Sequence, residues 1–491
     1  MHYHISVSDP QSRLLEITYN IPEISSDFIE VQLPAWRPGR YEIQNFAKNI
    51  QFIEAISEGN QKVPLHKVTK DRWRVGTAGL SEVSIRYTYY ANIQNAGSSY
   101  IDSELWYLNF INFCMYTEGR IQEPYTIRLD LPEGYQIACG LPSSGLNTLS
   151  ARDFYQLVDS PLLASQSLQK CEYHVRGVHF KIWMHGNLKP NWRRIERDFR
   201  RFSREQIAMM QEFPEKDYHF LNLILPTAFY HGVEHQNSTM IVLGPDDEGE
   251  GLYADLLGVS SHELFHTWNI IRIRPKELLP YDFTKENYFR TCFVAEGCTT
   301  YYGDLFLKRA GVFSHDTYIK ELQVYMKRHF ETAAYATQSL ADSSFDLWLD
   351  GYEKGIPNRK VSVYHKGALA ALILDLYLRK KTNHAHSLDD VMRLLWVRFG
   401  KPFIGYTLED YIQIVEEVAG ESLEWYWHDC IFTAEPLENR LNEALAFVGL
   451  QMSTFSNGNI QLNVLDDFKA KLQRDKWLST SQVLSIEEEE E

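Results

Sequence analysis

The residues with the clearest chemical potential are His262, Glu263 and His266, which form the pattern H-E-x-x-H in the segment SSHELFHTWN. In a helix, residues i and i+4 lie on the same face, so both imidazoles can reach one metal ion. Glu263 directly follows the first histidine and can act as a general base toward a water molecule at that metal. The pattern therefore predicts a zinc-dependent hydrolase, against the simpler interpretation of two surface histidines on a helix.

A catalytic zinc site needs a third protein ligand, which must come from another part of the chain. Glu296 lies 30 positions after His266, between Ala295 and Gly297 in an apolar helical pattern. A buried carboxylate needs a partner, and a metal ion can be that partner; the alternative is an ordinary helix glutamate. Asp304, two helical turns further along, is a candidate hydrogen-bond acceptor for a ligand histidine, although a surface aspartate would fit equally well.

Two further segments carry candidate substrate-binding groups. In FYHGVEHQNSTMIVLG, Glu234 stands just before an expected strand and could bind the ammonium group of a substrate, while Gly232 would let the backbone approach a ligand closely. In VSVYHKGALAALILDL, Tyr364 stands at the head of an apolar helix, where its hydroxyl could donate to a developing oxyanion. The alternatives are a solvated edge-strand glutamate and a packed core tyrosine.

The elements that must position these residues differ along the chain. Residues 1–165 show short alternating patterns separated by Pro and Gly, which predict an antiparallel β domain. A helical pattern follows Asn191, and residues 218–226 and 238–244 are typical of buried strands. Residues 252–446 are mostly helical, and the last 45 or so predict one or two strands and a tail. The pair Ser260–Ser261 is a candidate N-cap for the helix with the histidines, and the apolar run GLYADLLGV before it indicates burial.

Composition and charge exclude several classes of function. Aromatic residues make up 13% of the 491 residues, which is typical of a globular protein and excludes a largely disordered chain. The net charge of −16 argues against nucleic-acid or anionic-membrane partners, and the glutamates at 487–491 predict a solvated tail. No signal peptide or membrane span is recognisable, and six cysteines without any CxxC pair indicate reduced thiols, so we expect a cytoplasmic protein.

Four motifs in order resemble the glycyl aminopeptidase family of zinc metallopeptidases, which are thermolysin-like gluzincins related to the aminopeptidase N family. The resemblance extends over about residues 1–450, and the motifs are PAWRPGRYEIQNFAKNI, HGVEHQNST, HELFHTWNIIRIRPKEL with EGCTTYY, and YHKGALAALILDL. Two features depart from the family pattern: no recognisable PDZ domain follows PLENRLNEALAFVGL, and Ile271 stands where we expect a basic residue.

The resemblance implies a multidomain α+β fold. The implied division is an N-terminal antiparallel β domain at 1–165, a thermolysin-like zinc catalytic domain at 166–305, a mainly helical domain closing the active site at 306–446, and a short C-terminal extension with the acidic tail at 447–491.

The resemblance also implies a role for each candidate residue. His262, His266 and Glu296 match the zinc ligands, and Glu263 matches the catalytic base. Tyr364 aligns with the tyrosine that stabilises the tetrahedral intermediate in the related aminopeptidase N group. Glu234 aligns with the glutamate that holds the α-ammonium group of the substrate there.

These observations lead to one hypothesis with two alternatives. The hypothesis is a zinc aminopeptidase that removes N-terminal residues, with the family preference for Gly, Ala or other small residues, from peptides with a free N-terminus. The first alternative is a zinc endopeptidase, in which Glu234 binds no ammonium group. The second is a peptide-binding homologue without catalysis. We expect neither nucleic-acid nor membrane partners, and the oligomeric state stays open.

Overall fold

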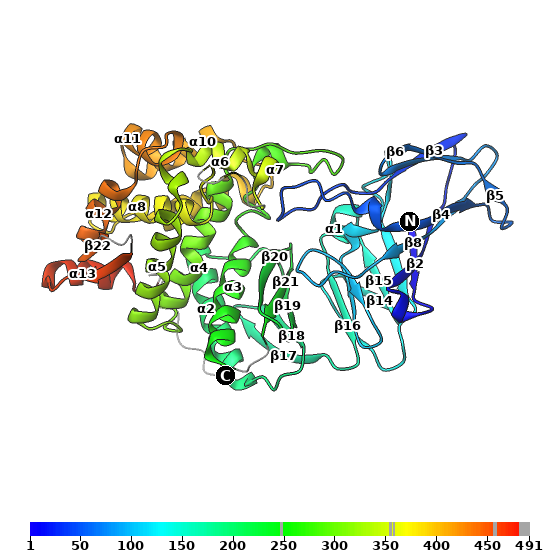
Figure 1. The fold of residues 1–491 in the computed structure, drawn as a ribbon, viewed down its shortest axis with the longest axis horizontal. Coiled ribbons are helices and arrows are strands. Elements are labelled where there is room, and N and C mark those ends of the chain that lie inside the picture. Colours follow the sequence, from blue (N-terminus) through cyan, green and yellow to red (C-terminus); the bar gives the residue numbers. More distant parts are fainter. Residues whose placement is uncertain (246–248, 353–355, 357–358, 455–458, 481–491) are drawn as a thin grey trace.

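The computed structural model describes residues 1–245, 249–352, 356, 359–454 and 459–480. Figure 1 shows three regions side by side: a β-rich region formed by the N-terminal part, a smaller sheet in the middle, and a mass of helices formed by the C-terminal part. The confirmed fold class is therefore α+β, with an N-terminal β domain and a mainly helical C-terminal part. The glutamates at 487–491 lie outside the described residues.

Three sheets build the N-terminal region. The eight-stranded sheet has the order β14-β15-β12-β1-β2-β8-β4-β5, with β1 (His2–Ser6), β2 (Leu14–Ile21), β4 (Ile50–Ile56), β5 (Lys62–Val63), β8 (Val83–Tyr90), β12 (Tyr125–Leu129), β14 (Ser143–Gly145) and β15 (Thr148–Ala151). One four-stranded sheet joins β11 (Tyr116–Thr117), β3 (Phe28–Gln32), β7 (Arg72–Gly76) and β6 (Leu65–Thr69). The other joins β13 (Gln136–Cys139), β16 (Leu162–Ser165), β10 (Trp106–Leu108) and β9 (Tyr100–Ile101).

Alternating sequence patterns explain these strands. In β8 the side chains of Val83, Ile85, Tyr87 and Tyr89 are buried, while the residues between them are more exposed. Every strand pair in the three sheets is antiparallel except β1 with β12, which is parallel. The expected antiparallel domain thus contains one parallel pair, formed when β12 adds to the edge of β1 after β2, β4, β5 and β8 have formed the other side of the sheet.

The central sheet has the order β17-β18-β19-β21-β20, formed by β17 (Gln169–Val175), β18 (Val178–His185), β19 (Asp217–Ile224), β21 (Ser238–Gly244) and β20 (Phe229–Glu234). On one face it packs against α2 (Trp192–Met210) and α3 (Glu250–His266). On the other face, side chains such as Leu221, Val233 and Val242 form a second core with Tyr107 and Leu163 of the N-terminal region. Burial on both faces explains the nearly continuous apolar runs of β19 and β21.

Strand β20 was not expected from the sequence, which placed Glu234 before a strand. The expected strand after Glu234 is β21, and Glu234 is also the last residue of the edge strand β20, which pairs antiparallel with β21. The segment FYHGVE lacks the β-branched run that marked its neighbours. Along β20, Val233 faces the second core, so Gly232 and Glu234 face α3.

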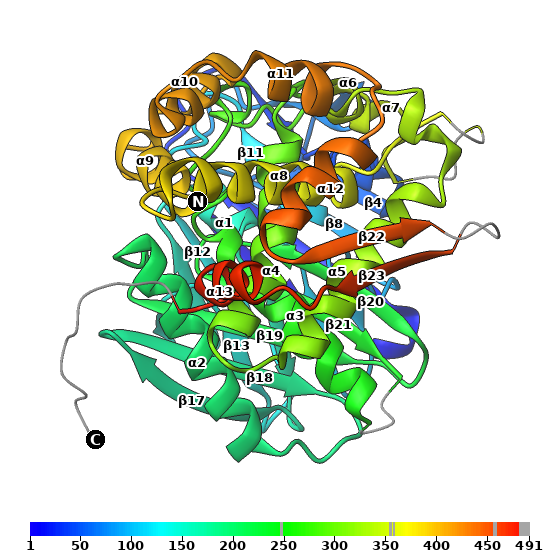
Figure 2. The same cartoon turned by 90° about the vertical axis from the view of Figure 1, so that its left-hand side faces the viewer.

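The C-terminal part is mainly helical, as Figure 2 shows from its own side. It contains the π-helix η5 (Phe293–Cys298), α4 (Thr299–Arg309), α5 (His315–Phe330), α6 (Leu340–Phe345), α7 (Leu347–Asp350), α8 (His365–Thr382), α9 (Leu388–Leu395), α10 (Leu408–Ala419), α11 (Glu424–Tyr426) and α12 (Glu438–Phe447). Helix α8 is buried along most of its length, which explains why its sequence is apolar around the whole circumference.

A hairpin and a helix follow at the end of the described chain. Strands β22 (Leu450–Thr454) and β23 (Ile460–Val464) pair antiparallel, and α13 (Phe468–Trp477) comes after them. The strands were expected and α13 was not. It is held by Trp477, whose buried indole donates to the Tyr301 hydroxyl at 2.9 Å. The predicted domain limit at residue 305 falls inside α4, and the four-part division stays a prediction.

A loop of the N-terminal region, residues 33–45, crosses to the rest of the molecule, and Figure 1 shows it reaching toward α7. The amide of Ala35 and the indole of Trp36 donate to the carbonyl oxygens of Phe283 and Asp282, at 2.8 Å each. Trp36 also packs edge-on against Trp348, with ring centroids 4.9 Å apart. The PAWRPGRY motif therefore makes these contacts outside the sheets of the N-terminal region.

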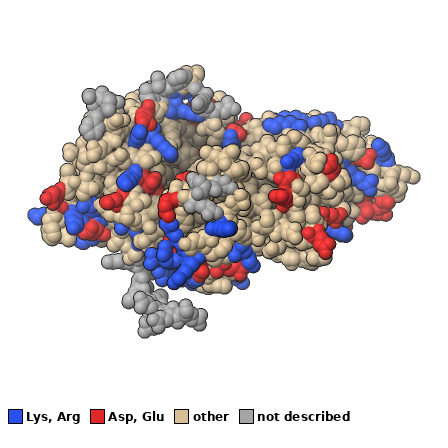
Figure 3. All heavy atoms as spheres, turned by 60° about the horizontal axis from the view of Figure 1, so that its bottom comes forward, with Lys and Arg blue, Asp and Glu red and all other residues tan. Residues whose placement is uncertain are grey.

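The surface carries charges of both signs. On the face drawn in Figure 3, Lys and Arg side chains gather in two places, at the lower edge and along the upper edge at the right, and elsewhere positive and negative side chains are interspersed. Among the described helices, none is long and apolar enough to cross a membrane.

Candidate metal centre

Helix α3 carries both histidines of the motif. It begins at Glu250, with Gly249 at the N-cap position, so the prediction of a cap at Ser260–Ser261 was wrong. Both serines are buried in the middle of the helix, and the Ser261 hydroxyl donates to the carbonyl oxygen of Gly303 in α4 at 2.7 Å. The serines thus bind the helix to its neighbour instead of starting it.

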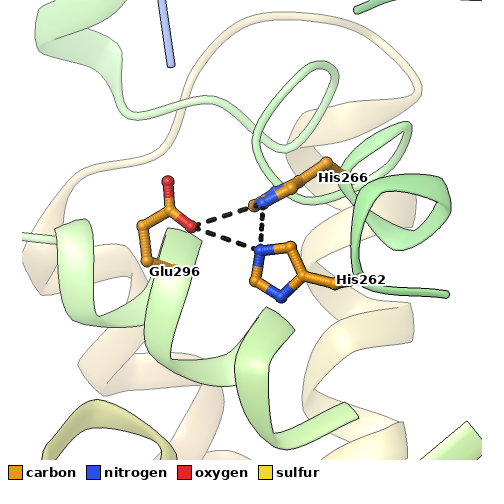
Figure 4. A group of neighbouring side chains, drawn as sticks. All are labelled: His262, His266 and Glu296. Atoms are coloured by element: carbon orange, nitrogen blue, oxygen red, sulfur yellow. Dashed lines mark hydrogen bonds and ion pairs between the residues drawn. The ribbon is translucent and has the colours of Figure 1, made fainter. Parts of the chain in front are cut away.

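His262, His266 and Glu296 converge on one point (Figure 4). The two Nε2 atoms lie 3.0 Å apart, and Oε2 of Glu296 lies 3.6 Å from Nε2 of His262 and 3.3 Å from Nε2 of His266. Ligands bound at about 2.0–2.2 Å in a tetrahedron around zinc lie about 3.4 Å from one another. The three distances therefore fit a single small metal ion.

The hydrogen bonds of His266 favour the tautomer that a metal needs. Its Nδ1 lies 2.5 Å from the carbonyl oxygen of Asn269. Because a carbonyl can only accept, Nδ1 carries a hydrogen, and Nε2 is the nitrogen that would present a lone pair to a metal ion once its own proton is lost.

Glu296 sits in η5, one turn of π-helix that continues directly into α4. Such wide turns occur often at functional sites, because the extra residue redirects a side chain. Glu296 is almost fully buried. Against the effect of burial, the positive charge of His266 and hydrogen bonds from both histidines lower the pKa of Glu296 to about 2.

Three buried carboxylates surround the histidines. Glu234, Glu263 and His266 also bring one polar atom each within 4.8 Å of the others. Burial raises the pKa of both Glu234 and Glu263. Burial opposes the charged form of His266, yet the charges of Glu296, Glu234 and Glu263 raise its pKa to about 10. The centre is thus a region of negative potential that a divalent cation would balance.

Gly232 provides the space for Glu263. A Cβ atom at Gly232 would lie 2.2 Å from Oε1 of Glu263 and 2.7 Å from a methyl group of Val259. From the sequence, Gly232 was expected to let the backbone approach a ligand closely. The structure shows a close approach between this strand and the carboxylate of Glu263.

The loop of residues 33–45, called here the crossing loop, covers Glu234. A Cβ atom at Gly39, whose φ is +76°, would lie 2.7 Å from Oε2 of Glu234. Both the dihedral angle and the space thus require glycine at this position. No role for Gly39 was predicted from the sequence, although the Pro-Gly pair in PAWRPGRY was the available signal.

Tyr364 is the residue just before α8, as expected. Here α8 and η5 touch through glycines, because a Cβ at Gly297 would lie 2.6 Å from Cα of Gly367. This contact brings Tyr364 close to Glu296. Burial raises the pKa of the Tyr364 hydroxyl well above its usual value, and the carboxylates of Glu296 and Glu234 add to the effect.

Two other residues of the sequence analysis lie nearby. Asp304 is buried, and its carboxylate accepts a hydrogen bond from the Tyr325 hydroxyl; within the described chain it makes none with His262 or His266. Ile271 is buried too, and its amide donates to the carbonyl oxygen of His266 at 3.1 Å. It therefore takes part in the turn that follows the second histidine.

Comparisons with known proteins agree with this architecture. The model of the Peptidase M61 N-terminal domain matches residues 2–166, and the model of the M61 glycyl aminopeptidase matches residues 255–370. The crystal structure of an aminopeptidase N family protein from Idiomarina loihiensis is 30% identical in sequence, with a TM-score of 0.87 over 92% of this chain and 79% of that one. The chain belongs to the M61 glycyl aminopeptidase family. It is therefore a metallopeptidase.

More distant structures share the fold. An M1 zinc metallopeptidase from Deinococcus radiodurans has a TM-score of 0.54 at 14% identity, over 88% of this chain and 94% of that one. A variant of that enzyme bound to a Tyr-Ser-Ala substrate gives the same TM-score and identity, over 88% and 93%. Curated protein sequences give no match.

Proposed function

We propose that this M61 family member is a zinc-dependent aminopeptidase with Gly and Ala among the N-terminal residues that it removes. The observation that carries the proposal is the convergence of His262, His266 and Glu296 beside two further buried carboxylates, Glu234 and Glu263. Two neutral imidazoles and one carboxylate are the ligand set of catalytic zinc sites that keep a position open. A bound zinc ion would supply a Lewis acid that makes a water molecule acidic and polarises the scissile carbonyl.

Glu263 is the proposed general base. Its Oε2 is buried and has no hydrogen-bond partner among the described residues, so this oxygen is available to a water molecule. It would accept the proton of the attacking water and deliver it to the leaving amine. Burial favours the protonated form that the second step needs.

Glu234 is the proposed binding site for the substrate's α-ammonium group. It lies at the end of edge strand β20, and the loop around Gly39 covers it. A buried carboxylate at the end of this strand would select peptides with a free N-terminus, because an acylated amine carries no positive charge. Gly232 belongs to the same strand and keeps Glu263 close to it.

Tyr364 is the proposed donor to the oxyanion. Its hydroxyl stays protonated at neutral pH, because burial raises its pKa. It would donate to the carbonyl oxygen as negative charge develops there, and the loss of one such donor commonly lowers the rate about 10²- to 10³-fold.

The decisive experiment measures hydrolysis of a panel of aminoacyl chromogenic amides, with and without a chelator and with zinc added back. We expect chelator-sensitive cleavage of the glycyl and alanyl amides that zinc restores. An N-acetylated peptide should stay intact; its cleavage would instead indicate an endopeptidase. No cleavage by protein that holds one zinc per chain would favour a peptide-binding homologue.

A further inference from the structure

A cavity of about 330 Å³ begins at Glu234 and extends away from the metal ligands. Its walls come from the crossing loop at Arg37 and Pro38, helix α1 (Phe154–Val158), the end of β20, residues 271–283 and Phe403. A single water needs only about 10–15 Å³ of such space, so the cavity could hold many waters. A glycine or alanine at the N-terminus of a substrate would leave nearly all of it unused.

Three arginines line this cavity without a close counter-charge. The side chains of Arg37 and Arg274 are nearly fully buried, with 2% and 9% of the residue exposed. Neither forms an ion pair with another described residue, and Arg272 reaches Glu215 only at 3.9 Å. In all three, Nε is buried and has no hydrogen-bond partner in the described parts of the chain. Burial of a charge without a partner is costly, so a ligand is the expected partner.

The protein holds these arginines in place by other means. A Cβ atom at Gly97 would lie 1.9 Å from Nε of Arg37, so glycine makes the room for this guanidinium group. The guanidinium group of Arg274 lies 4.2 Å from the ring centre of Tyr281, and those of Arg272 and Arg274 lie 5.2 and 5.1 Å from that of Phe403. Aromatic rings thus pack against Arg272 and Arg274. Nη1 of Arg37 and Nη2 of Arg274 donate to the carbonyl oxygens of Pro38 and Ile271, at 3.0 Å each, and Nε of every one of the three stays without a partner among the described residues.

The other charged residues along the walls are largely paired with one another. Asp159 lies 2.9 Å from Nδ1 of His235, and Asp153 lies 3.3 Å from Nε of Arg152. The lining thus carries four arginines against three carboxylates. Glu234 lies at the end near the metal centre, and Asp159 faces a histidine that is charged only when protonated, so a small excess of positive charge remains.

We propose that this cavity binds the side-chain carboxylate of an N-terminal Glu or Asp residue of the substrate. The assignment rests on the proposed function, in which Glu234 holds the α-ammonium group of the same residue. In an acidic first residue, the positive α-ammonium group would face Glu234, and the negative side-chain carboxylate would face the arginines beyond it. The arginines offer paired N–H donors, the geometry that a carboxylate accepts best.

The test compares amides of Glu and Asp with those of the uncharged isosteres Gln and Asn, on zinc-loaded protein. Hydrogen bonds to charged groups correspond to about ten- to a hundredfold in affinity, so kcat/KM for the glutamyl amide should exceed that for the glutaminyl amide by about tenfold or more. Cleavage of the glycyl and alanyl amides with no preference for Glu over Gln would overturn this inference and leave the proposed function intact.

Variants of Arg272, the most accessible of the three arginines, test whether the preference for the glutamyl over the glutaminyl amide arises in this cavity. Arg272→Gln should reduce the Glu-to-Gln ratio about tenfold, and Arg272→Glu should shift the preference toward the lysyl amide. The matched control is Arg204→Gln on the exposed face of α2, which should leave the ratio unchanged. An unaltered ratio in both Arg272 variants would exclude this site.

Binding gives a readout that needs no turnover. In calorimetric titration, free glutamate should bind the wild-type protein at least about tenfold more tightly than free glutamine, because only the side chains differ, and Arg272→Glu should remove the difference. Even if no amide is cleaved and the proposed function fails, this comparison still decides the inference: equal binding of the two amino acids contradicts it.

Discussion

At the scale of single residues, the surroundings of Glu263 are the feature of the site that bears most directly on catalysis. This carboxylate lies against the bare backbone of Gly232, is almost fully buried, and keeps one oxygen without a partner in the described chain. Such an arrangement is costly for a purely structural glutamate. A carboxylate that must exchange a proton with substrate needs an uncommitted oxygen of this kind.

The first prediction concerns Glu263→Gln. The amide is isosteric but cannot accept and return a proton, so turnover of the glycyl amide should fall about 10²- to 10⁴-fold. The metal content, measured by mass spectrometry, should stay at one zinc per chain, because Glu263 is not among the three converging ligands.

A matched control lies on the same helix. Glu250→Gln changes an exposed glutamate whose only close ion pair among described residues is with Arg194, and it should retain full activity. If Glu263→Gln also retained full activity, the general-base role would have to be abandoned.

At the scale of elements, glycine contacts set the positions of the functional side chains. Gly297 and Gly367 let η5 and α8 approach closely, and Gly303 lets α4 approach His262, whose Cβ would lie 3.3 Å from an added methyl group. Each of these glycines neighbours a candidate functional residue either in sequence or in space. The glycines in E-G and Y-H-K-G therefore determine how Glu296 and Tyr364 are placed relative to each other.

The second prediction concerns Gly297→Ala. The new methyl group would meet the backbone of Gly367 at 2.6 Å, so η5 and α8 must separate. We expect a lower affinity for zinc, a loss of activity, and a free energy of unfolding reduced by about 1–3 kcal/mol. Chemical denaturation and zinc titration measure these effects.

The control for this change is Gly251→Ala at the start of α3. No described atom lies within 4 Å of the added methyl group, and alanine favours a helix over glycine by about 1 kcal/mol. Stability should therefore stay equal or rise. Unchanged zinc affinity in Gly297→Ala would show that the glycine contact does not position Glu296.

At the scale of the whole molecule, a buried network joins three helices around the helical core. Asp389 at the start of α9 accepts hydrogen bonds from Arg309 of α4 at 3.0 and 3.2 Å and from the Tyr302 hydroxyl at 2.7 Å. Arg379 of α8 bonds to Asp375 and lies 3.8 Å from Asp389. These side chains are buried, so each charge depends on its partners.

The third prediction concerns Asp389→Asn. It leaves Arg309 buried with too little negative charge, and the free energy of unfolding should fall by about 3–5 kcal/mol. The comparison is Asp130→Asn, which breaks an exposed contact with His4 and should cost less than about 1 kcal/mol. Equal effects of the two substitutions in denaturant unfolding would contradict the importance of the network.

The carboxylate of Asp389 should also make the free energy of unfolding depend on pH. Although burial opposes it, the charges of Arg309 and Arg379 lower the pKa of Asp389 from 3.8 to about 2. A lowered folded-state pKa means that the contribution is complete above pH 3.8 and is lost as the pH falls toward 2. Between these pH values, wild-type stability should decline more steeply with falling pH than that of Asp389→Asn; parallel curves would exclude this carboxylate as the cause.

The sequence alone determined the features that depend on local geometry. The spacing of His262 and His266 places both rings on one helix face wherever that helix lies, and alternation predicted the strands of the N-terminal region. The family and its metallopeptidase class were predicted from four motifs and are confirmed. The roles of the individual site residues stay predictions.

Only the tertiary structure decided which distant residues meet. Gly39 lies against Glu234, Gly232 against Glu263, and Gly297 against Gly367, although each pair is far apart in the chain. No local pattern encodes such contacts, because they arise when whole sheets and helices pack. The arginine-lined cavity beside Glu234 is of the same kind: its walls come from seven separate segments, and a side chain's partners depend on all of them at once.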